Sequence, residues 1–446
     1  MDELAWNRQR LRSNNERMLL ERLRVHGPAS RAQLARDTGL SKPTVSHALA
    51  ALELHGLVRE AGKAAADRGR IALLYEPDPT AGYVLGIDVG RARLRAAVAD
   101  LGGEVLARTD VPNPERTATG VADAAVRAAA SALAAAQIPV DRVIHAALGT
   151  PGVYDPADGR VRYAVNLPGW GRTGLFDRIS GGLGGVELSV HNDANLAALG
   201  EYALGAGRGS RLFVYVLVGT GLGVGIVSHG ELFTGAHGAA GEVGFLPVSF
   251  TDPDGGRDAP RRGALEEAVS ADAVVRAAKA AGLGGKVTAK RVFDEARLGT
   301  PAAVAAVRQE SERLAQVIAA VSAVLDPDKV VLGGGVGHGA DLLLDQVGEA
   351  LHRATPLRPR VAPSQLGDDA VLLGAITTAV RTARPRVFDQ RTALAAGDSA
   401  VRVTVREPVR GPVRGPAGAG DSATVAVAAN VTAAGVAVAA GMAAER

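Results

Sequence analysis

Apolar residues recur at helical spacing over three consecutive stretches near the start of the chain, 15–25, 30–39 and 41–56. Ser30 begins the second stretch in the pattern of a capping box, and Ser41 is placed as an N-cap for the third. Glycine-containing turns separate the stretches. The pattern therefore predicts three short helices around a small core.

Two short helices around a glycine turn, the second beginning with small polar side chains, are typical of a helix-turn-helix. Apolar strands at 57–59 and 71–75 follow, and the basic segment between them predicts a β-wing. Through residue 70 the chain has 13 Lys and Arg against 8 Asp and Glu residues, an excess that suits phosphate contacts. A three-helix bundle used for protein contacts is the alternative. The residues expected at DNA are Ser30, Arg31, Ser41, Lys42, Thr44, Ser46 and His47 on the helices, and Lys63, Arg68 and Arg70 on the wing.

Short apolar strands alternate with helices from residue 83 onward. A strand at 83–87, a loop with Asp88 and Gly90, and a returning strand are how actin-like kinases begin their ATP-binding lobe. This order predicts an α/β domain. Further strands are expected at 94–98, 104–108, 143–148, 186–190, 213–218, 224–227 and 329–332, and helices at 121–136, 271–281, 289–298, 302–325 and 372–384.

The strands 213–218 and 224–227 are joined by a glycine turn that holds Gly219, Thr220, Gly221 and Gly223. Glycine lets backbone N–H groups approach an anion, and the threonine adds a hydroxyl donor, so the turn predicts a phosphate cradle. A plain hairpin is the alternative. The polar segment HNDAN precedes the turn and HGAAGE follows it, and both favour the functional interpretation.

Composition narrows the class of protein. The 446 residues suffice for two or three domains, and a net charge of +3 argues against a protein that coats nucleic acid throughout. The chain has no cysteine, which excludes thiol catalysis, disulfides and thiolate metal sites. A charged N-terminus and the lack of an apolar run of about 20 residues argue against export and membrane insertion. We expect a cytoplasmic protein.

The ordered motifs resemble the ROK family of repressors, open reading frames and sugar kinases, and in particular its transcriptional-regulator branch, which includes xylose and N-acetylglucosamine repressors. The resemblance covers roughly residues 10–382. It rests on seven segments spaced as in the family, SRAQLARDTGLSKPTVS, TPGVYD, NLPGW, HNDANLAALGE, VGTGLGVGIV, GAAGEVG and VLGGGV.

The resemblance implies an α/β fold class with a winged helix-turn-helix at 1–78, followed by a two-lobed actin-like ATPase (ribonuclease H-like) domain. The first lobe is expected at 79–198, completed by 366–384, and the second lobe at 199–365. From 385 to 446 the sequence is rich in proline, glycine and alanine without regular periodicity, which predicts a low-complexity, disordered tail.

The candidate site residues are hydrogen-bonding groups at strand ends and glycine loops. Asp193 follows a predicted strand, as a general base for a sugar hydroxyl would. Asn166, Asn192, Glu242 and Glu266 are the side chains expected to recognise sugar hydroxyls. By resemblance to the family, the residues expected at nucleotide or phosphate are Asp88, Gly90, Gly219, Thr220, Gly221, Gly223 and Gly334.

Two departures from the family pattern bear on cofactors. Family kinases carry two glycines and a threonine after the first-lobe aspartate, where this chain has Gly90 followed by Arg91, Ala92 and Arg93; the arginines either block ATP or grip a phosphorylated ligand. The family's structural zinc uses a histidine and three cysteines. Those positions hold Phe245, Arg257, Ala259 and Ala264, so we expect no zinc, and ATP hydrolysis is in question.

The sequence is thus interpreted as a sugar-responsive transcription factor, a repressor that binds operator DNA as a homodimer or homotetramer and is released by a sugar or sugar phosphate. It would act in the bacterial cytoplasm, at the nucleoid when bound. The first alternative is a sugar kinase with Asp193 as base. The second is a regulator that responds to a partner protein instead of a sugar.

Overall fold

The computed structural model describes residues 2–65, 71–164, 167–247 and 263–403. The chain divides into the units Met1–Ala396 and Gly397–Arg446, and all the sheets lie in the first unit. Among the described helices none is both long and apolar enough to cross a lipid bilayer.

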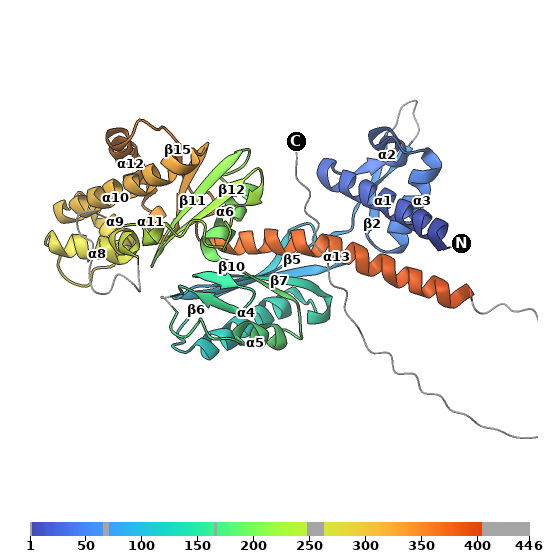
Figure 1. Cartoon of the computed structure of the whole chain (residues 1–446), viewed down its shortest axis with the longest axis horizontal. Coiled ribbons are helices and arrows are strands. Elements are labelled where there is room, and N and C mark those ends of the chain that lie inside the picture. Colours follow the sequence, from blue (N-terminus) through green and yellow to red (C-terminus); the bar gives the residue numbers. More distant parts are fainter. Residues whose placement is uncertain (1, 66–70, 165–166, 248–262, 404–446) are drawn as a thin grey trace, which may run out of the picture. The chain divides into compact units, whose positions relative to one another are not determined.

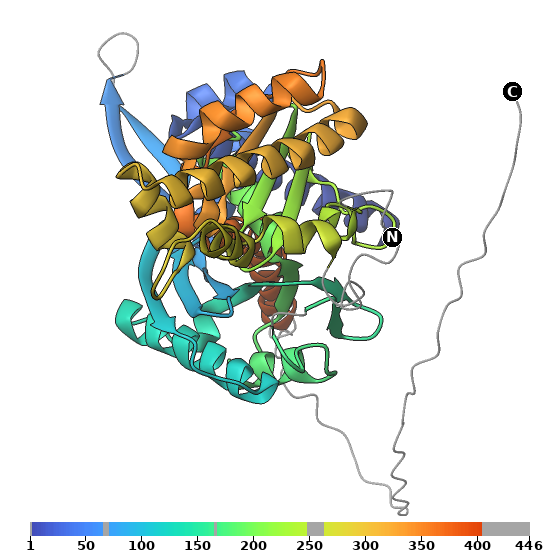
Figure 2. The ribbon, with the colours of Figure 1, turned by 90° about the vertical axis from the view of Figure 1, so that its left-hand side faces the viewer.

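The N-terminal segment forms a winged helix, as predicted. Its recognition helix α3 begins after Ser41, whose hydroxyl accepts a hydrogen bond from the N–H of Thr44. The helices pack through buried leucines, among them Leu23, Leu34 and Leu49. The two strands of the wing run antiparallel (Figure 2). The elements are α1 (Asp2–His26), α2 (Arg31–Thr38), α3 (Lys42–Leu54) and the sheet β1-β3-β2, with β1 at Ala29–Ser30, β2 at Val58–Ala65 and β3 at Ile71–Pro77.

The first lobe is built on a five-stranded sheet of order β10-β7-β4-β5-β6. β4, β5 and β6 are antiparallel to one another, whereas β7 runs parallel to β4 and β10 runs parallel to β7. The carboxyl ends of β4, β7 and β10 therefore lie at the same edge of the sheet. Two helices cover one face (Figure 1). The elements are β4 (Tyr83–Val89), β5 (Arg93–Asp100), β6 (Val105–Pro112), α4 (Ala118–Ala136), β7 (Val143–Thr150), β8 (Val153–Asp155), β9 (Arg160–Arg162), α5 (Leu175–Gly182) and β10 (Leu188–Asn192).

The second lobe repeats this plan with a sheet of order β13-β12-β11-β14-β15. Both faces of its central strand are buried: Val214 and Val216 face the layer of α10, whereas Phe213 and Tyr215 face α6. The elements are α6 (Asp193–Leu204), β11 (Leu212–Val218), β12 (Leu222–Ser228), β13 (Glu231–Leu232), α7 (Ala264–Val269), α8 (Ala271–Ala280), α9 (Ala289–Arg297), α10 (Pro301–Leu325), β14 (Lys329–Gly333), α11 (Gly334–Gly337), α12 (Ala340–Ala354) and β15 (Arg360–Pro363).

The last helix, α13 (Ala370–Val403), packs on the face of the first sheet opposite α4. It crosses α6 so closely that a Cβ on Gly374 would lie 1.8 Å from the carbonyl oxygen of Leu196. A Cβ on Gly200 of α6 would in turn lie 2.5 Å from the carbonyl oxygen of Ala370. Glycine at both positions is therefore what allows the two helix backbones to touch.

The prediction that a disordered tail begins at 385 was wrong for residues 385–403. Proline normally ends a helix, yet α13 continues through Pro385. The physical reason lies in tertiary packing, because Val387 and Phe388 are almost fully buried in the same core as Leu19 and Leu23 of the winged helix. Residues 404–446 lie outside the described part of the chain.

Candidate functional site

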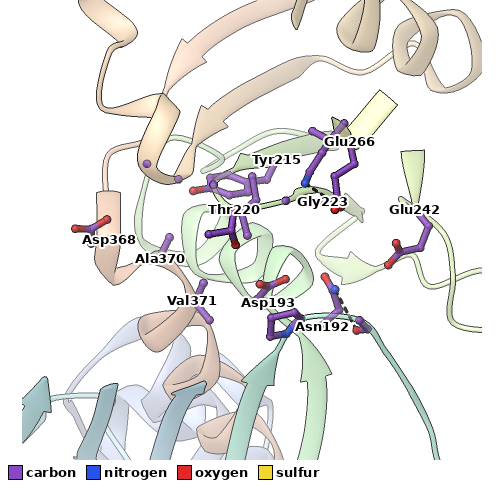
Figure 3. Close-up of a pocket in the computed structure, with 18 of the residues that line it drawn as sticks. Asn192, Asp193, Tyr215, Thr220, Gly223, Glu242, Glu266, Asp368, Ala370 and Val371 are labelled. Carbon is purple, nitrogen blue, oxygen red and sulfur yellow. Dashed lines mark hydrogen bonds between the residues drawn. The ribbon is translucent and has the colours of Figure 1, made fainter. Parts of the chain in front are cut away.

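The main candidate site is a cavity of about 210 Å³ between the two sheets. The end of β10, the β11–β12 turn, the start of α11 and the start of α13 all contribute to its wall (Figure 3). It brings together most of the side chains that the sequence singled out. Its lining includes Asn192, Asp193, Gly219, Thr220, Gly221, Gly223, Glu242, Glu266 and Gly334, together with Arg95, Tyr163, Tyr215 and Asp368, which were not predicted.

Asp193 is the first residue of α6 and directly follows the parallel strand β10. Its position at the carboxyl end of the strand places it at the cavity, and the helix fixes its backbone. The pKa of this half-buried carboxyl is raised to about 6, first by burial and then by the negative charges of Asp88 and Glu266. The N–H of Ala194 donates to one of its oxygens at 2.8 Å. A carboxyl that exchanges its proton near neutral pH is suited to general acid–base work.

Asn192 is mainly a structural residue. Its side-chain oxygen accepts the N–H of Asn195 at 3.1 Å and caps α6, and its amide nitrogen donates to the carbonyl of Gly152 at 3.2 Å. An asparagine side chain has two donors and two acceptor positions. One of each remains for a ligand, so capping and ligand binding are compatible.

Glu242 and Glu266 face the cavity from the second lobe (Figure 3). Burial raises the pKa of Glu242 to about 7, with added repulsion from Asp193 and Glu266. Glu266 accepts the N–H of Leu222 at 3.3 Å and so ties α7 to the glycine turn. Asp193 and Glu242 thus offer the cavity two carboxyl groups that can either donate or accept a hydrogen bond near neutral pH, which suits hydroxyl groups of a ligand.

The glycine turn forms the opposite wall of the cavity. A Cβ on Gly223 would lie 2.8 Å from the Cβ of Ala194, so this glycine lets the turn approach the first turn of α6. Gly334 has a φ of 77° and begins α11 beside Val218. The predicted hairpin of β11 and β12 is therefore present, and its turn faces the cavity, as a ligand-binding turn would.

Arg95 is the main residue that sequence reasoning missed. Its guanidinium reaches from β5 into the cavity and pairs with the buried Asp88 at 3.0 Å. It also lies 3.4 Å from a carboxylate oxygen of Asp110 and 3.9 Å from one of Asp368. Burial raises the pKa of Asp88 to about 6 despite the arginine. The signal in the sequence was the alternation on β5, where Arg95 shares a face with Arg93.

The first-lobe loop is not part of the cavity lining, and its expected role at a nucleotide or phosphate stays a prediction. Asp88 and Gly90 are absent from the lining, because Arg95 covers Asp88 and the backbone of Gly90 bonds to Arg93 and Asn113. Arg93 pairs with Asp110 at 2.6 Å. Arg91 lies at a separate, smaller cavity beside the N-terminus of α4. The carboxylate of Asp88 is therefore held in an ion pair with Arg95.

The zinc positions do not form a metal site in the described part of the chain, where no three His, Cys, Asp or Glu side chains lie together in a way that could hold an ion. Phe245 packs edge-on against Tyr163, with ring centroids 5.4 Å apart, and Ala264 begins α7. Arg257 and Ala259 lie outside the described residues, as does the candidate sugar ligand Asn166.

The winged helix leaves most of the expected DNA contacts accessible. Ser41, Lys42 and His47 are exposed at the start of α3, Thr44 and Ser46 are half-buried, and Lys63 is exposed on the wing. Ser30 is only 7% exposed, and its hydroxyl and its N–H both bond to Gln33, so its side chain serves the capping box and its contact with DNA stays a prediction. The guanidinium of Arg31 stacks over the ring of Tyr75. Arg68 and Arg70 lie outside the described residues.

Comparisons with known proteins match two parts of the chain, the N-terminal winged helix and the two-lobed domain that follows it. A family model described as the ROK family matches residues 84–382, and one described as the DprA winged helix domain matches residues 8–62. The N-acetylglucosamine repressor of Escherichia coli O157:H7 is 27% identical over 334 residues, which are 72% of this chain and 80% of that protein.

The similar solved structures include a kinase and a regulator. A ROK family glucokinase from Streptomyces griseus, in complex with glucose and AMPPNP, has a TM-score of 0.59 and 32% identity, and the match covers 67% of this chain and all of that one. A ROK family transcriptional regulator, a homologue of the E. coli MLC protein, has a TM-score of 0.69 over 85% of this chain and 98% of that one. At 24% identity the second shows the shared fold alone.

Proposed function

This chain belongs to the ROK family and carries an N-terminal winged helix domain, and we propose that it is a transcriptional repressor whose affinity for operator DNA is set by a sugar or sugar phosphate in the cleft. The S. griseus relative binds glucose, and the E. coli relative is a repressor, so each half of the proposal has a precedent within the family.

The observation that carries the proposal is the continuity of α13. The helix begins with Ala370 and Val371 in the cavity wall, and 20 residues later Arg391 donates hydrogen bonds to the carbonyls of His55 at 2.9 Å and Gly56 at 3.2 Å. The same guanidinium bonds to the carbonyl of Ala81. One continuous helix therefore contacts the cavity, the end of α3 and the linker, and this is the route by which we propose that ligand binding changes the position of α3.

DNA binding itself would use the N-terminal half of α3. Lys42 and His47 are exposed there, and the capped helix end directs backbone N–H groups outward, which favours phosphate. The operator is to be sought in the promoter region of this protein's own gene, because the similarity to the E. coli repressor does not specify an operator sequence. A homodimer reading two half-sites is the assembly we propose.

A sugar kinase is the second candidate, and the protonation behaviour of Asp193 favours it. The carboxyl has a raised pKa and faces the glycine turn across the cavity. Against it stands the ion pair between Arg95 and Asp88, which occupies the first-lobe aspartate. A coupled ATP assay over a panel of sugars decides: turnover that disappears in Asp193→Asn supports the kinase.

Operator binding tests the main proposal. Full-length protein is titrated against fragments of its own promoter region at fixed salt, with and without a panel of sugars and sugar phosphates, because salt alone changes phosphate contacts. We expect sequence-specific binding that one compound weakens at least tenfold. A ligand that binds free and DNA-bound protein equally would shift nothing, so binding that no compound alters overturns the sugar-responsive part of the proposal.

A further inference from the structure

Two aromatic side chains meet at the cleft, one from each lobe. Tyr163 follows β9 of the first lobe and lines the cavity, and Phe245 ends the short helix Val243–Phe245, three residues after Glu242. Their ring centroids are 5.4 Å apart and the ring planes are inclined at 65°. Two rings at this angle form a corner that leaves ring faces open to a ligand.

Both rings are exposed although large aromatic side chains usually bury most of their surface. Tyr163 is 57% exposed and Phe245 is 45% exposed. The chain has only 2 Trp, 6 Tyr and 7 Phe residues, so aromatic surface is scarce. In a chain with few aromatic residues, an exposed pair of rings beside a polar cavity indicates a ligand-binding surface.

The backbone conformation of Tyr163 is energetically unfavourable. Its φ is 65°, a left-handed conformation that a bulky residue seldom adopts. The hairpin before it is fixed, because a Cβ on Gly152 would lie 2.4 Å from the carbonyl oxygen of Arg162 and because Arg162 pairs with Asp155. Strain of this kind persists where the surroundings determine the conformation, and it is concentrated at binding sites.

We propose that Tyr163 and Phe245 form a second subsite, so that the ligand is a glycoside with two rings. The first ring would be hydrogen-bonded in the cavity by Asp193, Asn192 and Glu242. The second ring would rest its apolar face against the aromatic corner. This inference rests on the proposed function, since it requires the cleft to bind a sugar.

The chemistry of the surface favours this ligand class. The side chains of Asn192, Asp193 and Glu242 are partly buried, whereas both rings of the aromatic pair are exposed, so the polar and the apolar groups differ in their access to a ligand. A disaccharide and an aryl glycoside share the required chemistry, a polar ring followed by a ring with an apolar face.

Calorimetric titration of the full-length protein tests the proposal. The ligands are glucose, xylose and N-acetylglucosamine, a disaccharide of each, and the matching nitrophenyl glycosides. We expect the two-ring ligands of one sugar to bind at least tenfold more tightly than the free sugar. Disaccharides that bind better than nitrophenyl glycosides identify a sugar as the second ring, and the reverse order identifies an aryl group; either order supports the second subsite.

Variants locate the effect. Tyr163→Ala and Phe245→Ala are each expected to weaken two-ring ligands about tenfold and to leave the free sugar unchanged, because only the second ring loses its contact. Tyr163→Phe keeps the ring and is expected to bind normally. Phe233→Ala removes a comparably exposed phenylalanine, 50% exposed, that follows β13 and is not part of the ring pair of Tyr163 and Phe245, and it should change nothing.

The outcomes separate this inference from the proposed function. Free sugars that bind as tightly as two-ring ligands, or alanine variants that weaken both classes equally, overturn the second subsite while the sugar-responsive regulator stands. If none of the ligands binds the wild-type protein, both the subsite and the sugar effector are overturned, and operator binding alone then shows whether the chain is a DNA-binding protein.

Discussion

Three carboxyl groups around the cleft hold protons at pH values where free carboxyl groups have lost them. Asp88 and Asp193 have pKa values raised to about 6, and Glu242 to about 7. Burial is the first cause for all three. A raised carboxyl pKa makes ionisation costly in the folded protein, so these residues lower stability at neutral pH, which is expected where a site is shaped for a ligand instead of for folding.

Asp193→Asn should therefore stabilise the protein above pH 6. The unfolded carboxyl ionises near pH 4 and the folded one near 6, so the cost of the charge is absent below pH 4, grows between these values and is complete above them. We expect a gain of about 1–3 kcal/mol at pH 8 and none at pH 4. Thermal unfolding at several pH values measures this, and a gain that does not change with pH contradicts it.

Arg95→Met should leave Asp88 as a buried charge without its partner. The ion pair joins two largely buried groups, and breaking such a pair typically costs about 3–5 kcal/mol. The loss should be greatest at pH 8 and smaller at pH 5, where Asp88 takes up a proton. Chemical denaturation of the single variant and of Arg95→Met with Asp88→Asn tests the cause, because the double variant should recover most of the loss.

At the scale of single residues, the sequence led to most of the acidic and glycine residues that the structure brings together in one cavity, and their roles in binding a ligand stay predictions. Asp193, Glu242 and Glu266 follow strand ends or glycine loops, and such positions can be read from a pattern. The alternation on β5 places Arg95 on one face with Arg93, but a pattern cannot show that Asp88 lies beside Arg95 on the neighbouring strand. Ser30 illustrates another difficulty, since a serine that caps a helix and a serine that contacts DNA have the same side chain.

At the scale of elements, the contact between α6 and α13 is the most demanding in the fold. Gly374→Ala should be strongly destabilising, on the order of 3 kcal/mol, because its Cβ would meet the backbone oxygen of Leu196 instead of a side chain that can move. Gly348→Ala on α12 is the matched control, since nothing lies within 4 Å of its Cβ position. That change should be neutral or slightly stabilising in a thermal melt; similar losses in both variants would contradict the steric explanation.

Element types and order were predictable because both sheets have strands with buried faces and both domains have capped helices. The predicted strands and helices are present, with ends that differ by a few residues, whereas the helices α5, α6 and α12 and the strand β15 were not predicted. Two further differences depend on tertiary contacts. β1 is two residues long and exists only because it pairs with β3, and α13 passes Pro385 only because Val387 and Phe388 reach the core of the winged helix.

At the scale of the whole molecule, Arg391 should be needed for sugar to change the affinity for the operator. It should not be needed for binding sugar or for binding the operator. Arg391→Met removes the hydrogen bonds to the carbonyls of His55, Gly56 and Ala81 while leaving the cavity and the exposed face of α3 intact. We expect unchanged sugar affinity, near-normal operator affinity, and at least a fivefold smaller effect of sugar on the operator. Arg381→Met, on the same helix but paired with Glu231, is the control and should respond normally.

Under the proposed regulation, the crossing of Gly200 and Gly374 would act as the fulcrum of a lever. At about 1.5 Å per residue, α13 extends about 6 Å from the crossing back to Ala370 in the cavity wall and about 26 Å forward to Arg391 at the winged helix. A turn about this point, measured relative to the second lobe, would multiply a displacement roughly fourfold. A shift of about 1 Å beside the ligand would become about 4 Å at α3, comparable with the 3.4 Å step between base pairs. A movement no larger than the closing of one hydrogen bond would then be enough to put α3 out of step with its half-site.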